Sequence, residues 1–436
     1  MTLVDLIPRT PSDRAIEALP VAIIGAGPIG LAAAANLAES GIDFVVYEAG
    51  DDVAASVQEW GHTRLFSPWR HLVDPASRRL LEAEGWESPA PKRAPTGAEF
   101  VQRYLRPLAK VPVIAAHVRT GVEVLAVARQ GMDRTRTRAR AATPFVLRLR
   151  SASGAVSETG ARAVIDASGT YRSPNPLSSS GLDLLGMDDI ADRVTRALPD
   201  VLGGDRGRFT GRHVTVVGAG HSAANTLLGL VSLAREDEGT TVTWLIRNAQ
   251  AVRVSSSPDD ELAGRADLGS RVDAAVSQGE ISVVDGFEIL RARRVDGRVE
   301  LVGLRRGEAA AHVTDVVVNA TGFRPDLAML REVRLDLDEI VEAPRRLAPL
   351  IDPNEHSCGT VEPHGFHELT HPEPGFFLVG MKSYGRAPTF LLATGYEQVR
   401  SVTAWLAGDT AAASRVELTL PTTGVCSTDE AGGCCS

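Results

Sequence analysis

The chain has 436 residues, of which 44% are hydrophobic and 23% charged, as is typical of a soluble protein with material for two or three domains. A formal net charge of −9 disfavours a nucleic-acid partner, because binding to phosphates needs a clustered cationic surface. The first 20 residues carry acidic side chains and no continuous apolar run, so we expect no secretory signal and a cytoplasmic protein.

A glycine-rich turn follows the first apolar run of the chain. Residues 21–24 are typical of a strand buried in a parallel sheet, and the Ala/Leu-rich residues 29–40 are typical of a helix. The region is apolar enough to suggest a membrane span, but its glycines, proline and asparagine fit a nucleotide-binding turn better than a helix facing lipid. We therefore predict a strand, a turn and a helix here, and no membrane partner.

The glycines of this turn have the spacing of a dinucleotide site. Gly25 allows a tight turn, Gly27 lets the backbone approach a pyrophosphate, and Gly30 permits close packing of helix on strand. The amides at the start of the helix, together with its dipole, favour a phosphate. The next strand, residues 44–48, ends in a carboxylate that can accept hydrogen bonds from ribose hydroxyls. We predict FAD in this site, bound by Gly25, Gly27, Pro28, Gly30 and Glu48.

A second glycine turn repeats the pattern later in the chain. A strand at residues 213–217 leads into it, a helix follows over 221–234, and the next strand spans 241–246. Arg247 stands in the place of the ribose carboxylate, where a guanidinium suits a 2′-phosphate through a bidentate contact. For His221, a surface role at the helix start is the alternative to contact with the pyrophosphate. We predict NADPH in this site, bound by Gly218, Gly220, His221, Ser222, Ala223 and Arg247.

Downstream of each turn, a strand closes on a corner made of two small residues and a glycine. These segments are residues 163–169 and 316–322, and they argue against a single nucleotide site accompanied by an incidental turn. By contrast, the Arg-dense residues 134–140 alternate as a strand or loop would, which predicts a solvated face rather than a ligand patch. We add the corner residues Ser168, Gly169, Thr321 and Gly322 to the predicted cofactor sites.

These motifs predict an α/β fold with two Rossmann-like dinucleotide-binding domains, the NADPH domain being inserted into the FAD domain. The expected order is the N-terminal part of the FAD-binding domain (1–175), a connector (176–211), the NADPH-binding domain (212–326), the C-terminal part of the FAD-binding domain (327–420) and a flexible cysteine-containing tail (421–436).

Taken together, the motifs resemble those of the flavin-containing and class B monooxygenases, which include Baeyer–Villiger and N-hydroxylating enzymes. The resemblance is carried by the two turns, with Glu48 and Arg247, and by residues 319–326, which are similar to the family's Ala-Thr-Gly corner between domains. Residues 209–213 give only the opening of the Baeyer–Villiger signature, so ketone oxygenation is in doubt. The Cys-x4-Cys or Cys-x2-Cys pair of the disulfide reductase branch is absent from the sequence.

The resemblance implies hydride transfer from NADPH to flavin N5, followed by reaction with O2 to a C4a-(hydro)peroxide that oxygenates a small soft nucleophile. It also implies that a helix from about Thr389, with Pro388 in its first turn, points at the flavin and stabilises its reduced anion. Lys382 or Arg386 could add a full charge, and an exposed loop is the alternative. The loop residues selected are Gly380 and Thr389 for the cofactor, and Lys382, Tyr384 and Arg386 for catalysis.

The polar excursion at residues 51–95 lies where the resembling enzymes place chain near the flavin or the substrate entrance. We select Trp60 and Arg64 as cofactor contacts, and Arg64 as catalytic as well. Structural packing is the alternative, above all for Trp69.

The four cysteines are unevenly placed. Cys358 stands alone in a histidine-rich loop that we expect over the flavin, and we select it as catalytic. The other three lie in the last eleven residues, where three thiolates can bind As(III), or two can bind Hg(II). This tail resembles the vicinal-cysteine terminus of mercuric reductase and is similar to the tails of flavoproteins associated with bacterial arsenic-resistance gene clusters. An incidental set of thiols is the alternative to a metal site at Cys426, Cys434 and Cys435.

Three functions follow from these patterns. The first is an FAD- and NADPH-dependent monooxygenase that acts with O2 on a small molecule with an N, S or As centre. The second is a reductase or oxidase of a thiophilic metal or metalloid, such as arsenic or mercury, with the tail as collector. The third is a redox-sensing or metal-sequestering flavoprotein with little turnover. Each is compatible with a homodimer.

Overall fold

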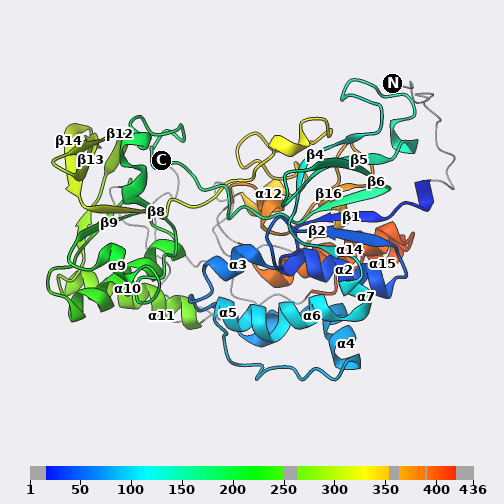
Figure 1. Cartoon of the computed structure of the whole chain (residues 1–436), viewed down its shortest axis with the longest axis horizontal. Coiled ribbons are helices and arrows are strands. Elements are labelled where there is room, and N and C mark those ends of the chain that lie inside the picture. Colours follow the sequence, from blue (N-terminus) through cyan, green and yellow to red (C-terminus); the bar gives the residue numbers. More distant parts are fainter. Residues whose placement is uncertain (1–15, 249–262, 353–362, 388–389, 419–436) are drawn as a thin grey trace.

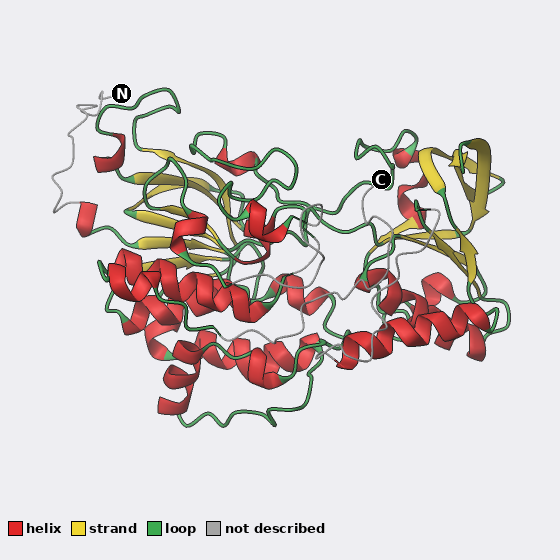
Figure 2. Ribbon diagram, turned by 180° about the vertical axis from the view of Figure 1, so that it is seen from behind, coloured by secondary structure: helices red, strands yellow, loops and turns green. Residues whose placement is uncertain are grey.

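The computed structural model of the protein describes residues 16–248, 263–352, 363–387 and 390–418. Two lobes lie side by side, and in each a parallel sheet is covered by helices (Figures 1 and 2). This arrangement confirms the predicted α/β fold class with two Rossmann-like sheets. None of the described helices is long and apolar enough to cross a membrane.

The first lobe is built on a five-stranded sheet in the order β16-β7-β1-β2-β3. β1 lies in the middle, and all four of its apolar side chains are buried, as expected for a parallel strand covered on both faces. All five strands run in the same direction, so their carboxyl ends meet at one edge, where ligands bind in open α/β sheets. The strands are β1 (Val21–Ile24), β2 (Phe44–Tyr47), β3 (Val118–Arg119), β7 (Ala163–Asp166) and β16 (Phe376–Leu378).

Two helices from distant parts of the sequence lie side by side against this sheet. α2 (Pro28–Glu39) begins with proline in its first turn, one residue earlier than predicted. The alanines at 32–35 are fully buried, and such small side chains let α14 (Leu392–Leu406) lie directly alongside α2 (Figure 1). The prediction that α14 starts at about Thr389 is wrong, because Leu391 is still extended and precedes the first helical residue. Pro388 and Thr389 lie outside the described residues.

An antiparallel meander covers the opposite face of the first sheet. Phe145 and Leu147 of this meander share a buried cluster with Ile24 and Val164 of the sheet. The alternation of inward and outward side chains in Phe145–Ser151 is typical of a strand with one solvated face. The meander consists of β4 (Val122–Arg129), β5 (Phe145–Ser151) and β6 (Val156–Ala161).

The second lobe repeats this plan with the strand order β11-β10-β9-β15-β8. Val214 and Val216 of β9 are buried against the helices, whereas Val217 packs against a second meander. The predicted connector contributes the edge strand β8 to this sheet. The elements are β8 (Val194–Arg196), β9 (His213–Val217), α10 (His221–Glu236), β10 (Thr241–Leu245), α11 (Ala263–Ser277), β11 (Ser282–Val284), β15 (Val316–Asn319) and the meander β12 (Phe287–Val295), β13 (Arg298–Arg305) and β14 (Glu308–Thr314).

Shorter helices complete the two lobes. They are α3 (Ala55–Glu59), α4 (Pro75–Ala83), α5 (Gly97–Phe100), α6 (Arg106–Lys110), α7 (Pro112–Ala115), α8 (Met187–Ile190), α9 (Arg206–Phe209), α12 (Ala348–Ile351), α13 (Phe366–Leu369) and α15 (Thr410–Ser414). In the first lobe, α4, α5, α6 and α7 lie beneath α2 and α14 in the view of Figure 1, and α4 belongs to the excursion after β2.

The Arg-dense stretch is not entirely solvated, which corrects the sequence prediction. Three of its arginines are exposed, but Arg140 is 4% exposed and forms an ion pair with Glu373 at 2.7 Å. Arg129 binds the same carboxylate at 2.7 Å. Burial raises the pKa of Glu373, yet the hydrogen bonds from Arg140 and Arg129 outweigh it and the net pKa shift is downward. Arg140 therefore fastens the 134–140 loop to the first lobe.

Candidate functional site

The first glycine turn is shaped by backbone contacts that leave room for no side chain at two of its three glycines. Gly25 has φ +96°, and a Cβ there would stand 2.9 Å from the carbonyl oxygen of Ala167. A Cβ at Gly30 would overlap the carbonyl oxygen of Gly25. Gly27 differs, because a Cβ there would meet nothing within 4 Å. The backbone at Gly27 thus faces open space, and α2 begins beside it with no side-chain cap.

The second turn has the same construction. Gly218 has φ +125°, and a Cβ there would overlap the carbonyl oxygen of Ala320. Gly220 faces open space, and α10 also begins without a side-chain cap. The third position is Ala223, which is fully buried, so this turn accommodates a Cβ where the first one does not. Both turns therefore present uncapped helix amides beside an open glycine, which fits the pyrophosphate of a dinucleotide.

The two corners after β7 and β15 are also built alike. In the first, Ser168 donates its backbone N–H and its hydroxyl to Asp166 Oδ1, at 3.1 and 2.6 Å. In the second, Thr321 makes the same two bonds to Asn319 Oδ1, at 3.2 and 2.7 Å. The strand-end residue is charged in one corner and neutral in the other. A buried carboxylate needs a counter-charge, whereas the neutral amide of Asn319 does not.

Lys382 supplies the charge that the first corner requires. Its Nζ lies 2.7 Å from Asp166 Oδ2 and donates to the hydroxyl of Ser168 at 3.1 Å. Lys382 is 1% exposed and Asp166 is fully buried. The ammonium is therefore committed to the corner that touches Gly25. Its charge is therefore met by Asp166 and Ser168, and the addition of a full charge beside the flavin by Lys382 stays a prediction.

The residues predicted to bind the two riboses lie at the ends of corresponding strands. Glu48, just after β2, accepts hydrogen bonds from Ala26 N at 2.8 Å and from Gly50 N at 2.9 Å. Each carboxylate oxygen retains a lone pair, so Glu48 fixes the glycine turn and can still accept a hydrogen bond from a hydroxyl. Arg247 is exposed, and among the described residues its side chain donates to the carbonyl oxygen of Ser179, at 3.3 Å. This bond uses one of the five N–H donors of the guanidinium.

The loop before α14 contains three of the predicted residues in different environments. Gly380 has φ +67° and donates its N–H to Gln398 Oε1 at 2.7 Å. Tyr384 is 1% exposed, and burial raises the pKa of its hydroxyl well above the usual range. Arg386 is exposed and forms an ion pair with Glu342 at 2.7 Å. Arg386 is thus turned away from Lys382 and the corner. Its position agrees with the alternative given for this residue, an exposed loop.

The excursion after β2 reaches the second lobe through a residue that the sequence analysis did not select. The ring of Phe66 lies 5.0 Å from the ring of His221, the first residue of α10, and packs against the core of the second lobe. Arg64 is exposed and donates to the carbonyl oxygen of Ala94 at 2.6 Å. Trp60 is half-buried against Gly97. Trp69 is 1% exposed and lies in the core, which agrees with structural packing, the alternative given for this residue.

Adding a methyl group at Gly97 tests the placement of Trp60. A Cβ there would stand 2.9 Å from two ring carbons of Trp60, so we expect Gly97→Ala to destabilise the fold by about 1–3 kcal/mol. Urea denaturation measures the loss of stability, and tryptophan fluorescence reports the displacement of the Trp60 ring. Gly207→Ala is the matched control, because a Cβ at that helical glycine meets nothing within 4 Å. Equal stability of the two variants would contradict the contact.

Two chain segments cross between the lobes and pair with each other. Arg324 N donates to the carbonyl oxygen of Ser173 at 2.9 Å, and Asn175 N donates to that of Gly322 at 2.9 Å. Asn319 Nδ2 adds a hydrogen bond to the carbonyl oxygen of Asn175 at 2.9 Å. We call these residues, 173–175 and 322–324, the crossing ribbon. It holds the second corner, and thereby the second glycine turn, to the connection between lobes.

Several predicted residues lie outside the described part of the chain. These are Cys358, Thr389 and the three tail cysteines, Cys426, Cys434 and Cys435. Within the described residues, no group of three His, Cys, Asp or Glu side chains could hold a metal ion. The proposed tail site is therefore carried by the sequence alone.

Comparison with known proteins places this geometry among redox enzymes. A family model described as pyridine nucleotide-disulphide oxidoreductase matches residues 22–358. No curated protein matches the chain significantly. Solved structures do: bacillithiol disulfide reductase of Bacillus cereus has a TM-score of 0.65 at 20% identity, over 89% of this chain and 99% of that one.

Monooxygenases share the fold as well. The cadaverine monooxygenase of desferrioxamine biosynthesis from Erwinia amylovora, bound to FAD, has a TM-score of 0.62 at 15% identity, over 93% of this chain and 98% of its own. A mutant flavin monooxygenase from Stenotrophomonas maltophilia has a TM-score of 0.57 at 22% identity, over 89% of this chain and 98% of its own. The fold is thus similar to that of both reductases and monooxygenases.

Proposed function

Because the chain belongs to the pyridine nucleotide-disulphide oxidoreductase family, and is therefore an oxidoreductase, we propose that it is an FAD- and NADPH-dependent monooxygenase. Its substrate is a small molecule with a soft nucleophilic centre, at nitrogen, sulfur or arsenic. FAD lies at the first glycine turn and NADPH at the second. The bound flavin supplies the redox chemistry, taking a hydride from NADPH and passing electrons to O2.

The first turn and its surroundings support the FAD assignment. Open space at Gly27 and the uncapped start of α2 suit the pyrophosphate, and Glu48 suits ribose hydroxyls. Lys382 and Asp166 hold the corner against Gly25, which keeps these donors in position. Lys382 is thus a positioning residue in this proposal, and its charge is balanced before any cofactor binds.

The start of α14 supports the exclusion of water beside the first turn. A Cβ at Gly395, in the first turn of α14, would lie 2.7 Å from the ring of Phe390, and Phe390 in turn lies 5.1 Å from the ring of Tyr384. Gly380 packs against Ile29 of α2 in the same place. These apolar contacts fill the space between the first turns of α2 and α14. A dry environment strengthens electrostatic interactions with a bound cofactor.

The single observation that favours a monooxygenase over a disulfide reductase is the placement of cysteine. The first 357 residues contain none, and the sequence has no Cys-x2-Cys or Cys-x4-Cys pair. A dithiol that relays electrons to a disulfide substrate therefore has no counterpart in the sheet or the glycine turns. Electrons that reach the flavin then need a diffusible acceptor, and O2 is the acceptor of the monooxygenase branch.

The experiment that tests this proposal measures coupling. The purified FAD-loaded protein is mixed with NADPH and with amines, sulfides, arsenite or organoarsenicals, while NADPH oxidation, O2 uptake and peroxide are followed together. A monooxygenase consumes one O2 per NADPH and releases little peroxide when the right substrate is present. NADPH oxidation that proceeds unchanged without O2 contradicts the proposal.

Removing the guanidinium of Arg247 tests the assignment of NADPH. Arg247→Ala should raise the KM for NADPH by about tenfold or more, as expected when a charge-assisted contact of about 1.5–3 kcal/mol is lost. The KM for NADH should change little, because NADH has no 2′-phosphate. Steady-state kinetics with both cofactors measure the effect. An equal change with both would show that Arg247 does not contact the 2′-phosphate.

A second candidate function is favoured by the clustering of three cysteines in the last eleven residues. In this alternative, the tail delivers a thiophilic metal or metalloid for reduction or oxidation. Changing Cys434 and Cys435 to serine would then abolish metal-dependent NADPH oxidation, whereas a monooxygenase acting on amines or sulfides keeps its turnover. Metal-stimulated turnover that survives both changes excludes the collector role.

A further inference from the structure

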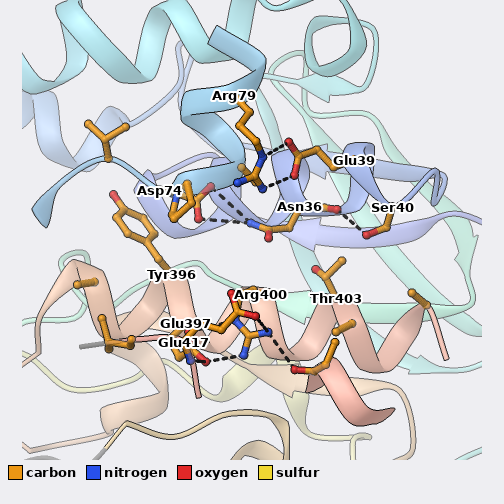
Figure 3. A pocket seen from close by; sticks show the side chains of 18 of the residues that line it. Asn36, Glu39, Ser40, Asp74, Arg79, Tyr396, Glu397, Arg400, Thr403 and Glu417 are labelled. Atoms are coloured by element: carbon orange, nitrogen blue, oxygen red, sulfur yellow. Dashed lines mark hydrogen bonds and ion pairs between the residues drawn. The ribbon is translucent and has the colours of Figure 1, made fainter. Parts of the chain in front are cut away.

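A cleft of about 640 Å³ lies in the first lobe between α2, α4 and α14 (Figure 3). Its volume is within the range of small-molecule sites, which is about 300–1,000 Å³. Asn36 and Glu39 line it from the C-terminal half of α2, so the cleft lies about 14 Å along that helix from Gly27. None of the residues predicted to bind FAD lines this cleft.

Most of the charged side chains of the cleft are already paired. Arg79 on α4 binds Glu39 on α2 at 2.6 Å, and Arg400 on α14 binds Glu397 at 2.5 Å and lies 3.7 Å from Glu417 (Figure 3). These pairs form the walls and largely cancel each other's charge. A ligand must therefore be recognised by polar side chains of the cleft that are not already in an ion pair.

Asp74 is such a group. It is 1% exposed and is the N-cap residue of α4, with Oδ2 accepting both the N–H and the hydroxyl of Ser77, at 2.7 and 2.8 Å. Within the described residues, its Oδ1 has a single 3.4 Å contact, with the Asn36 side chain, which Figure 3 shows between the helices. Arg79 is held by Glu39, and no ion pair to Asp74 is found in the described part of the chain. Burial accordingly raises the pKa of Asp74.

Thr403 is a second such group, on the opposite wall. It is 2% exposed, and among the described residues its hydroxyl has no hydrogen-bond partner. A threonine inside a helix often donates to the carbonyl of the preceding turn, as Thr226 does to Ser222 at 2.8 Å. Thr403 does not, and its side chain extends from α14 toward α2 (Figure 3). A buried hydroxyl without a partner carries a free-energy cost that a ligand could relieve.

Small apolar side chains also line the cleft. They are Val73, Ala76, Ala393, Ala404 and Ala407. We propose that the cleft binds a small alkylammonium compound with a second polar group. Its ammonium is received by Asp74 Oδ1, its alkyl chain lies along the alanines, and its second polar group, a hydroxyl or an amine, bonds to Thr403. This site is separate from the two nucleotide turns and adds a binding activity to the proposed redox function.

The proposal is tested by isothermal titration of the full-length, FAD-loaded protein with 4-aminobutan-1-ol, n-butylamine, n-butanol and butyrate. The amino alcohol should bind most tightly and at one per chain, n-butylamine more weakly, and the neutral and anionic compounds not measurably. Amines that bind no better than n-butanol overturn the proposal.

Two near-isosteric variants locate the binding. Asp74→Asn keeps a good helix cap and should weaken both amines by about tenfold or more. Thr403→Val should weaken the amino alcohol but leave n-butylamine unchanged. Thr226→Val, whose hydroxyl is bonded within α10 in the other lobe, is the control and should alter neither. Amine binding that persists unchanged in both cleft variants, for example at the flavin, overturns the proposal.

Discussion

Replacing Lys382 with methionine should lower the free energy of unfolding by about 3–5 kcal/mol, because the buried Asp166 carboxylate loses its counter-charge. The corner against Gly25 should shift as well, so the variant should retain less FAD after purification. Urea denaturation and the flavin absorbance of the purified protein measure the two effects.

The second corner provides the design of the rescue. There Asn319 makes, without a charge, the two bonds to Thr321 that Asp166 makes to Ser168. The double variant Asp166→Asn/Lys382→Met should therefore recover most of the lost stability. Arg386→Met is the matched control, because its ion pair with Glu342 is exposed and should be worth less than about 1 kcal/mol. A double variant as unstable as Lys382→Met alone would refute the charge argument.

Adding one methyl group at Gly218 should have the largest effect on the NADPH half of the reaction. Gly218 has φ +125°, a conformation that costs a residue with a side chain about 1–3 kcal/mol, and the new Cβ would also overlap the carbonyl oxygen of Ala320. The turn must shift, so kcat/KM for NADPH should fall by about a hundredfold. Stopped-flow reduction of the flavin by NADPH measures this loss.

Gly220→Ala is the informative partner of that variant. The backbone at Gly220 is extended and a Cβ there meets nothing within 4 Å, so the fold should be as stable as before. The methyl group would nevertheless occupy the space assigned to the pyrophosphate, and the KM for NADPH should rise. Unchanged NADPH kinetics in Gly220→Ala would show that the phosphate does not approach this glycine.

The parts of the fold that could be predicted from the sequence are those set by local pattern. Apolar runs at 21–24 and 213–217, each followed by glycines at fixed spacing, suffice to place strand, turn and helix to within one or two residues. The positive φ of Gly25 and of Gly218 is a local requirement for glycine, although the carbonyl oxygens of Ala167 and Ala320 that crowd them come from distant parts of the chain. Local pattern also located the two corners, although not what holds them.

What the sequence could not reveal depends on contacts between distant residues. Lys382 is 216 positions from Asp166, and nothing near either residue indicates the pairing. Arg140 reads as one of several surface arginines until Glu373 is seen beside it. A usable signal did exist for Lys382: one corner ends its strand in Asp where the other has Asn, and a buried carboxylate needs a cation.

The crossing ribbon gives the two lobes a particular mechanical relation. A single linking segment could swivel freely, but two segments joined by backbone hydrogen bonds between Ser173 and Arg324, and between Asn175 and Gly322, bend together and resist twisting. We therefore expect relative motion of the lobes to favour opening and closing over twisting. Because Asn319 ties this ribbon to the second corner, such a motion carries the second glycine turn as a rigid unit. The distance between the two turns can then change while each keeps its shape.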